Sequence, residues 1–160
     1  MVSAGERVTF EPASPDAAGA VMAWALSSSF SRRWVDTSRD AEANLAEWAS
    51  LDGAVSYLLR VHGVPVAYGE VWLDGQGSEA EVAHIVVDPA HRGEGWGREL
   101  TLRLAEYASS LATDLVLRVD PENIHAQHVY RRCGFQPMSV DDQKLFNAGQ
   151  PHEYLWMRRE

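Results

Sequence analysis

The segment that most constrains the fold is HRGEGWGREL, residues 91–100, in which three glycines alternate with larger residues. The preceding run, EAEVAHIVV, is rich in β-branched residues and predicts a strand that Asp88-Pro89 ends. Apolar residues at helical spacing follow, from Leu100 to Leu111. A glycine turn between a strand and a helix predicts outward-pointing, unpaired amides at the helix start, which are suited to an anion.

The rest of the chain predicts one mixed α/β (α+β) domain over residues 1–160, with about seven strands and about four helices around a central sheet. Besides the strand just described, strands are expected at 7–11, 54–63, 64–74, 114–119, 135–140 and 152–159. Helices are expected from Ser14-Pro15-Asp16 to about residue 28, at 40–49, through 100–111, and from Asp120-Pro121-Glu122 to Gly134. There is no repeat, low-complexity segment or linker.

Composition narrows the class of protein. Hydrophobic residues make up 46% and charged residues 23% of the 160, as in globular proteins. The N-terminal MVSAGERVTF lacks the pattern of a secretory signal, and no apolar run approaches the ~18 residues of a membrane span. Cys133 is the only cysteine, so no internal disulfide can form. We expect a cytoplasmic protein without a membrane partner.

The net charge of -9 argues against binding to the phosphate backbone of nucleic acids and favours cationic or neutral substrates. The six histidines show no HxxxH or HxH spacing, so no metal site is expected.

Two phosphate-binding motifs fail at the glycine segment. A P-loop needs GxxxxGK[ST], and the chain has no Lys-Ser or Lys-Thr pair. The dinucleotide fingerprint GxGxxG would place its third glycine at Arg98 or Leu100.

A third pattern fits. Arg92-Gly93-Glu94-Gly95-Trp96-Gly97 matches R/Q-x-x-G-x-G/A, and PENIHAQHVYRRCGF further along matches N-x-x-A-x-x-x-Y-x-x-x-G-F. Both resemble the GNAT superfamily of N-acetyltransferases, and the order of expected elements from about residue 7 to 159 is similar to the family's. The resemblance implies acetyl-CoA as acyl donor and no metal.

The resemblance also implies the cofactor site. The amides from Gly93 to Arg98 would bond the pyrophosphate, and side chains on the glycines would hold it off. The backbone of the preceding strand would pair with the pantetheine arm, and one of its amides would hold the thioester oxygen. The expected residues are Ile85, Val86, Val87, Arg92, Gly93, Glu94, Gly95, Trp96, Gly97, Arg98, Asn123 and Tyr130.

For catalysis, the resemblance implies that the Tyr130 hydroxyl protonates the departing thiolate, a task suited to a phenol that stays protonated at pH 7. The general base stays open between Glu81, His84 and Glu70. Strand alternation predicts Glu81, Ala83, Ile85 and Val87 on one face and His84 on the other. Some relatives use a glutamate at the position of Arg118, which argues against acetylation of the ribosomal-protein type.

We therefore expect an N-acetyltransferase that moves the acetyl group directly to a primary amine in a ternary complex, since no activated nucleophile is visible. The acidic charge favours a small cationic amine; a peptide or protein amine, or a non-catalytic acyl-CoA-binding module, are the alternatives. Expected substrate contacts are Phe30, Trp34 and Glu70. Homodimers are common in the family, and the two closing strands would offer an interface.

Overall fold

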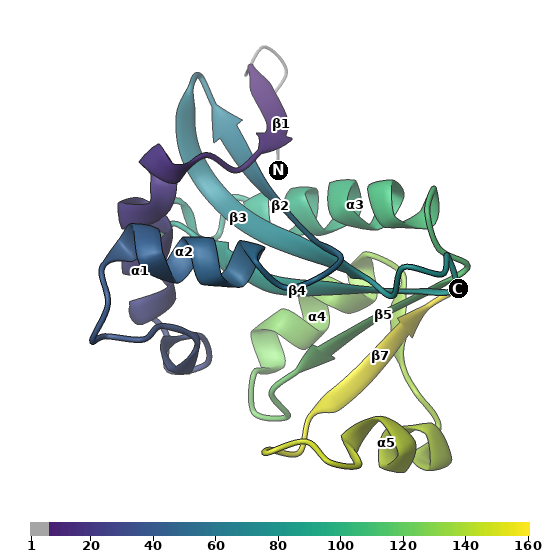
Figure 1. The fold of residues 1–160 in the computed structure, drawn as a ribbon. Helices are drawn as coiled ribbons and strands as arrows, with labels where there is room; N and C mark the ends of the chain where they lie inside the picture. The colour runs from purple at the N-terminus through teal and green to yellow at the C-terminus, as the bar shows by residue number, and fades with distance from the viewer. Residues whose placement is uncertain (1–6) are drawn as a thin grey trace.

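The computed structural model describes residues 7–160, which form one seven-stranded sheet with five α-helices (Figure 1). The strand order is β1-β2-β3-β4-β5-β7-β6, and only the β4–β5 pair is parallel. The strands are β1 Val8–Pro12, β2 Ala54–Val61, β3 Val64–Leu73, β4 Glu79–Val87, β5 Asp114–Val119, β6 Phe135–Pro137 and β7 Leu155–Arg159. This confirms the expected mixed α/β domain with a seven-stranded sheet.

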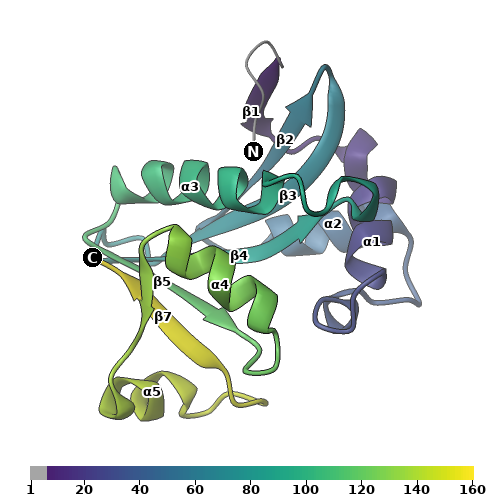
Figure 2. The same cartoon turned by 180° about the vertical axis from the view of Figure 1, so that it is seen from behind.

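Helices cover both faces of the sheet. Figures 1 and 2 show α1 (Ala18–Leu26) and α2 (Ala41–Ala49) on one face, and α3 (Trp96–Ser109) and α4 (Ile124–Arg132) on the other. Three short 3₁₀ helices, at Pro15–Ala17, Arg32–Trp34 and Pro89–His91, complete the connections. The core is correspondingly divided into one cluster that includes Leu100 and Leu104 of α3 and a second that includes residues of α1 and α2. A third, small cluster contains Val116, Met138 and Trp156.

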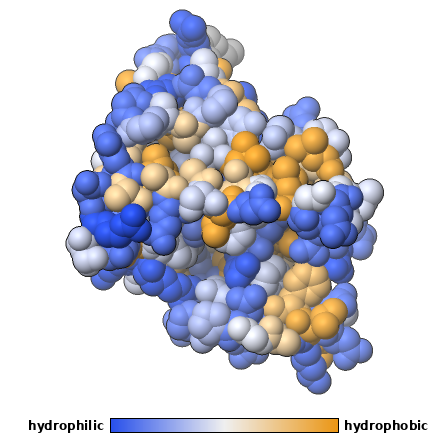
Figure 3. All heavy atoms as spheres, viewed as in Figure 1, coloured by the Kyte–Doolittle hydropathy of each residue, from blue (hydrophilic) through white to orange (hydrophobic). Residues whose placement is uncertain are grey.

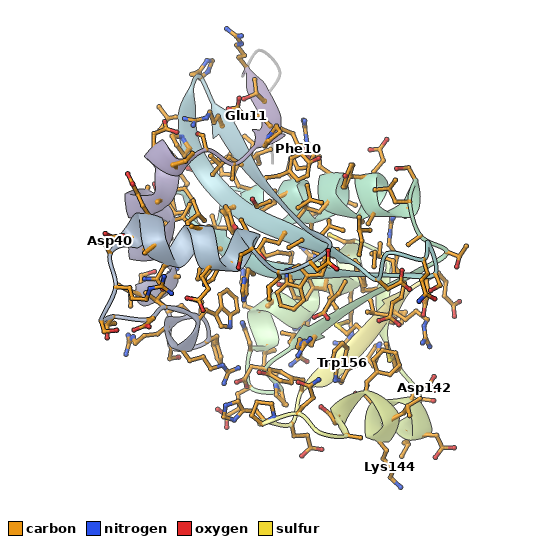
Figure 4. All side chains as sticks on the ribbon, viewed as in Figure 1. Phe10, Glu11, Asp40, Asp142, Lys144 and Trp156 are labelled. Atoms are coloured by element: carbon orange, nitrogen blue, oxygen red, sulfur yellow. The ribbon has the colours of Figure 1, made fainter. Side chains whose placement is uncertain are left out.

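A fifth helix, α5 (Val140–Asn147), replaces part of the strand predicted at 135–140. Strand β6 ends at Pro137, and the Ser139 hydroxyl then caps α5 by accepting a hydrogen bond from the amide of Asp142 at 3.2 Å. A serine followed by two aspartates is a helix-start pattern, and it identifies this helix in the sequence. Figure 4 labels Trp156 of β7, whose ring packs 5.0 Å from that of Phe146 and whose indole donates to Asn147.

Other predicted helix boundaries shift by a few residues. Ser14 bonds the side chain of Asp16 and does not cap a helix; a 3₁₀ turn precedes α1. Helix α3 ends at Ser109, so Leu111 lies outside it and is exposed. Helix α4 starts at Ile124 and not near Asp120, because Asn123 caps it by accepting a hydrogen bond from the amide of Ala126.

Strand β4 contains a bulge that overturns the predicted alternation. Tyr68 of β3 pairs with Val86 and Glu70 pairs with Ala83, so that only Gly69 stands opposite His84 and Ile85. His84 takes a φ of 50°, in the left-handed region, and the extra residue shifts the strand's two faces by one. Ile85 and Val87 therefore pack with Val82 on the α3 side, whereas His84 contacts Glu70. The expected grouping of Glu81 with Ile85 and Val87 was wrong.

Gly69 is part of this arrangement. A Cβ at that position would lie 2.6 Å from Cδ1 of Leu104 and 3.2 Å from Cδ2 of Leu100. The missing side chain lets α3 approach β3 opposite the bulge, which keeps the bulged strand packed against the helix.

The surface is mostly polar. Figure 3 shows hydrophilic residues over most of the face seen in Figure 1, with hydrophobic atoms in separate patches. Within residues 7–160, none of the helices combines the length and the apolar character required to cross a bilayer.

Asn44 fixes the connection between the 3₁₀ helix Arg32–Trp34 and α2, whose first turn is capped by Asp40 (Figure 4). Its side chain is buried. The side-chain oxygen accepts a hydrogen bond from the backbone N–H of Asp36 at 2.8 Å, and the side-chain nitrogen donates to the backbone carbonyls of Asp36 and Asp40 at 2.9 and 3.0 Å. It also donates to the carbonyl of Arg39 at 3.3 Å, so the side chain holds four backbone groups together.

We predict that Asn44→Ala lowers the free energy of unfolding by about 1–3 kcal/mol, because it leaves partly buried backbone groups without partners. Urea denaturation measures the change. Glu42→Ala, an exposed site on the same helix, should change the stability by less than about 0.5 kcal/mol. Equal effects of the two substitutions would contradict the role of Asn44.

Candidate active site

A cavity of about 480 Å³ opens where β4 and β5 diverge. The two strands pair only through Glu79–Asp114, Ala80–Leu115 and Glu81–Val116, and they separate beyond that point, as Figure 1 shows. Residues of β4, β5 and α4 line most of the space, with contributions from α1, β3, α3 and the connecting segments. The lining residues are Trp24, Ser28, Phe30, Ser31, Arg33, Trp34, Trp72, Glu81, Val82, Ala83, His84, Ile85, Val86, Val87, Arg92, Gly97, Arg118, Val119, Asp120, Asn123, His125, Ala126, Val129, Tyr130 and Tyr154.

One end of the cavity lies at the start of α3. Gly95 caps this helix with a φ of 90°, a left-handed conformation that strongly favours glycine. Among residues 7–160, no group accepts a hydrogen bond from the backbone amides of Trp96, Gly97 and Arg98. Arg92 adds a cation at the cavity wall and donates to the Ser27 hydroxyl at 2.9 Å. Unpaired amides beside an arginine form a site for an anion.

Most of the glycine segment does not border the cavity. Of Gly93 to Arg98, only Gly97 lines it. The Trp96 side chain is buried in the core, where its indole donates to Glu94 at 3.1 Å, and the Arg98 side chain is exposed elsewhere. Gly93, Glu94, Gly95, Trp96 and Arg98 thus lie outside the cavity lining, and main-chain contacts of these residues with the cofactor stay a prediction.

Tyr130 faces the cavity from α4. Burial raises the pKa of its phenol, and the nearby Cys133 adds to this shift, so the hydroxyl keeps its proton well above neutral pH. No residue in the range 7–160 forms a hydrogen bond with this hydroxyl. Asn123 also lines the cavity, although its side-chain oxygen is engaged as the cap of α4.

Cys133, the single cysteine, is 2% exposed at the end of α4. Burial raises the pKa of its thiol, which opposes the thiolate form that nucleophilic attack requires. This position fits a packing role.

Glu81 forms a two-pronged ion pair with Arg118 across the point where β4 and β5 part. The Arg118 Nε and Nη2 donate to the two carboxylate oxygens at 2.7 and 2.9 Å, and Nη1 donates to Gln150 at 3.0 Å. The guanidinium also lies 4.6 Å from the ring centre of Trp156. Both oxygens of Glu81 are therefore occupied.

His84 and Glu70 form a second pair. Glu70 is fully buried and accepts hydrogen bonds from the Tyr68 hydroxyl at 2.6 Å and the Trp72 indole at 2.7 Å, while His84 Nδ1 lies 3.1 Å from the same carboxylate. His84 lines the cavity and Glu70 does not. Glu70, expected to contact substrate, is thus covered from it, because the bulge places His84 between the carboxylate and the cavity.

The aromatic wall is larger than the sequence suggested. Phe30 and Trp34, the expected substrate contacts, line the cavity together with the rings of Trp72 and Tyr154 and the guanidinium of Arg33. Arg33 directly precedes Trp34, an expected substrate contact, and Trp72 follows Glu70 at strand spacing. Nothing in the sequence around Tyr154 indicates its position.

The raised tyrosine pKa values predict a loss of stability in alkali. Above pH ~10 the unfolded chain releases the Tyr130 proton and the folded protein retains it, so the free energy of unfolding falls as the pH rises, by up to about 1.4 kcal/mol per pH unit for each such group. Burial beside Glu70 acts in the same direction on Tyr68.

Urea denaturation of the protein and of Tyr130→Phe between pH 7 and 11 measures this effect. The variant should show the shallower decline above pH ~10 and a parallel course below pH ~9, where tyrosines are neutral in both states. Parallel curves throughout would contradict the shift.

Comparisons with known proteins agree with the fold. The profile of the acetyltransferase (GNAT) family matches residues 20–135. An uncharacterized protein of Mycobacterium leprae is 42% identical over 82 residues, 51% of this chain and 22% of that protein. A mycothiol acetyltransferase of Actinosynnema mirum is 36% identical over 110 residues, 67% of this chain and 36% of the enzyme. The chain thus spans between a fifth and two fifths of the length of these relatives.

Among solved structures, the putative acetyltransferase yncA of Salmonella typhimurium, with its cofactor acetyl-CoA, has a TM-score of 0.70 and 22% identity, covering 96% of this chain and 94% of its own. A chimera of the Vibrio cholerae spermidine N-acetyltransferase SpeG has a TM-score of 0.75 and 17% identity, covering 95% and 94%. These likenesses show the fold. The matched profile covers most of the chain and shows the family: the chain belongs to the GNAT acetyltransferase family.

Proposed function

We propose that the protein transfers an acetyl group from acetyl-CoA to a primary amine by direct attack, with Tyr130 as general acid. The observation that carries the proposal is the Tyr130 hydroxyl, which borders the cavity, holds its proton and has no partner among the described residues. A protein that only binds acyl-CoA would not need a free phenol at this place.

The residues present fit acetyl-CoA. Its pyrophosphate suits the unpaired amides at the start of α3 and the Arg92 guanidinium. Beyond Glu81, the edge of β4 that faces β5 is unpaired, and an amide-bearing arm can bond such an edge as an added strand would. When bound, acetyl-CoA supplies a thioester, and the reaction forms a nitrogen–carbon bond, breaks the carbon–sulfur bond and releases a free thiol.

The Tyr130 hydroxyl supplies a proton to the departing sulfur. A phenol serves this purpose only while it is neutral, which an ordinary phenol already is at pH 7, and burial raises the pKa of Tyr130 further. Its position on α4 places it beside Val129 and Ala126, which line the same wall.

The general base in this proposal is His84. Both oxygens of Glu81 accept hydrogen bonds from Arg118, so accepting the amine's proton would require breaking a two-pronged ion pair. His84 Nδ1 faces the buried Glu70, which leaves Nε2 as the ring nitrogen available to the amine. Glu81 then has a positioning role, since it holds Arg118 at the cavity wall.

We predict that Tyr130→Phe lowers turnover by about 10- to 1000-fold with little change in acetyl-CoA affinity, because the general acid is lost and the anion site is intact. Thiol release with an amine panel and calorimetric titration with coenzyme A measure the two quantities. Tyr107→Phe, on α3 and outside the cavity, is the matched control and should retain turnover. Full turnover of Tyr130→Phe would remove the acid assignment.

The base assignment predicts that His84→Gln lowers kcat/KM by about 100- to 10,000-fold at neutral pH. Glu70→Gln keeps the ring but removes the negative charge beside it, so the acidic limb of the kcat/KM profile should move to lower pH. A role for Glu70 in packing alone would lower activity without moving that limb. If Glu81→Gln abolished the acidic limb and His84→Gln retained it, Glu81 would be the base.

A further inference from the structure

Resting on the proposed function, we propose that the acceptor is an amine that also carries a carboxylate, bound by Arg33, and an apolar or aromatic body held between the cavity rings. This substrate class differs from the cationic amine that the net charge of -9 favours. The charges that matter are those at the cavity wall, and there the arginines Arg33, Arg92 and Arg118 face only two acidic residues, Glu81 and Asp120.

The cavity has a cofactor end and an acceptor end. Val87, Arg92 and Gly97 mark the first, beside the start of α3. Glu81 lies six residues earlier on β4, at most about 20 Å away, since the bulge shortens the rise of a fully extended strand. Contacts connect the residues of this second end: the Arg118 guanidinium lies 5.7 Å from the ring centre of Trp72 and 5.5 Å from that of Tyr154.

Arg33 stands at this acceptor end with its donors unused. Its guanidinium lies 5.5 Å from the ring centre of Tyr154 and 3.7 Å from Asp120 Oδ2, which is beyond hydrogen-bond length. It forms no hydrogen bond with any residue in the range 7–160. By contrast, Arg118 uses all three of its nitrogens on Glu81 and Gln150. A guanidinium with a free fork is the side chain best suited to a carboxylate.

A second ammonium group finds no free carboxylate in the described cavity. Both oxygens of Glu81 are taken by Arg118, and Glu70 is sealed beneath His84. Asp120 accepts from the amide of Glu122 with one oxygen and faces Arg33 with the other. A polyamine would therefore bring an additional positive charge next to Arg33 without a partner, which disfavours it.

The walls between these charges are aromatic. Phe30, Trp34, Trp72 and Tyr154 line the space, and the ring of Trp34 lies 4.7 Å from that of His84. An apolar or aromatic substrate body buries its surface against such rings. The amine would then lie near His84 and the carboxylate near Arg33.

The test compares thiol release from acetyl-CoA with L-phenylalanine and with phenethylamine, which differ only in the carboxylate, and with spermidine. The ratio of kcat/KM for phenylalanine to that for phenethylamine should fall by about 10- to 100-fold in Arg33→Gln, the range of a lost charged hydrogen bond. Comparing ratios between variants cancels the difference in intrinsic amine reactivity. Arg32→Gln makes the same charge change one residue away, outside the cavity, and should keep the parent ratio.

Three outcomes would overturn the inference. The first is a ratio that Arg33→Gln leaves unchanged, and the second is a preference for spermidine over phenylalanine. The third is a rise in the KM for acetyl-CoA as the main effect of Arg33→Gln, which would place Arg33 at the cofactor. The failure of the proposed function looks different. In that case no amine, phenethylamine included, releases thiol from a protein that binds coenzyme A, and the inference is rejected with it.

Discussion

The bulge in β4 determines which way His84 and the residues after it face. One additional residue opposite Gly69 turns His84 toward Glu70 and turns Ile85 and Val87 toward α3. Without it, His84 would lie on the opposite face, and the buried Glu70 carboxylate would lack one of its three partners. An unpaired carboxylate at that depth would be costly, so the bulge and the Glu70–His84 pair stabilise each other.

The separation of β4 from β5 is the second constraint, and the Glu81–Arg118 pair lies where it starts. From Glu79 to Glu81 of β4 the two strands are hydrogen-bonded. Beyond Glu81, toward Val87, the facing edges of the two strands are unpaired and the cavity begins. The ion pair thus links the last paired residue of β4 to Arg118, which lies two residues beyond the last paired residue of β5. Trp156 and Tyr154 cover the guanidinium, and Trp156 is itself fixed by α5. In this way a helix far from the start of α3 supports the acceptor end.

Much of this could be predicted from the sequence, and the failures have particular causes. β5 was predicted with the bounds observed, and α2 within one residue, because a short apolar run and the helical spacing of apolar residues are local signals. The bulge was missed because its cause is tertiary: the close approach of α3 to Gly69 is invisible in the strand's own residues. Arg33 and Tyr154 come together from segments about 120 residues apart, and a linear pattern cannot reveal such a pair. Net charge likewise averages over the whole surface and does not describe one cavity.

The buried position of Cys133 has a practical consequence. With 2% of its surface exposed and the pKa of its thiol raised by burial, the folded protein presents almost no reactive sulfur. A reagent that labels thiols therefore reports coenzyme A, and not the protein, while the chain is folded. When Cys133 becomes exposed, the reagent attaches one label to each protein molecule, because the chain has a single cysteine. The rate of labelling therefore measures how often the end of α4 opens.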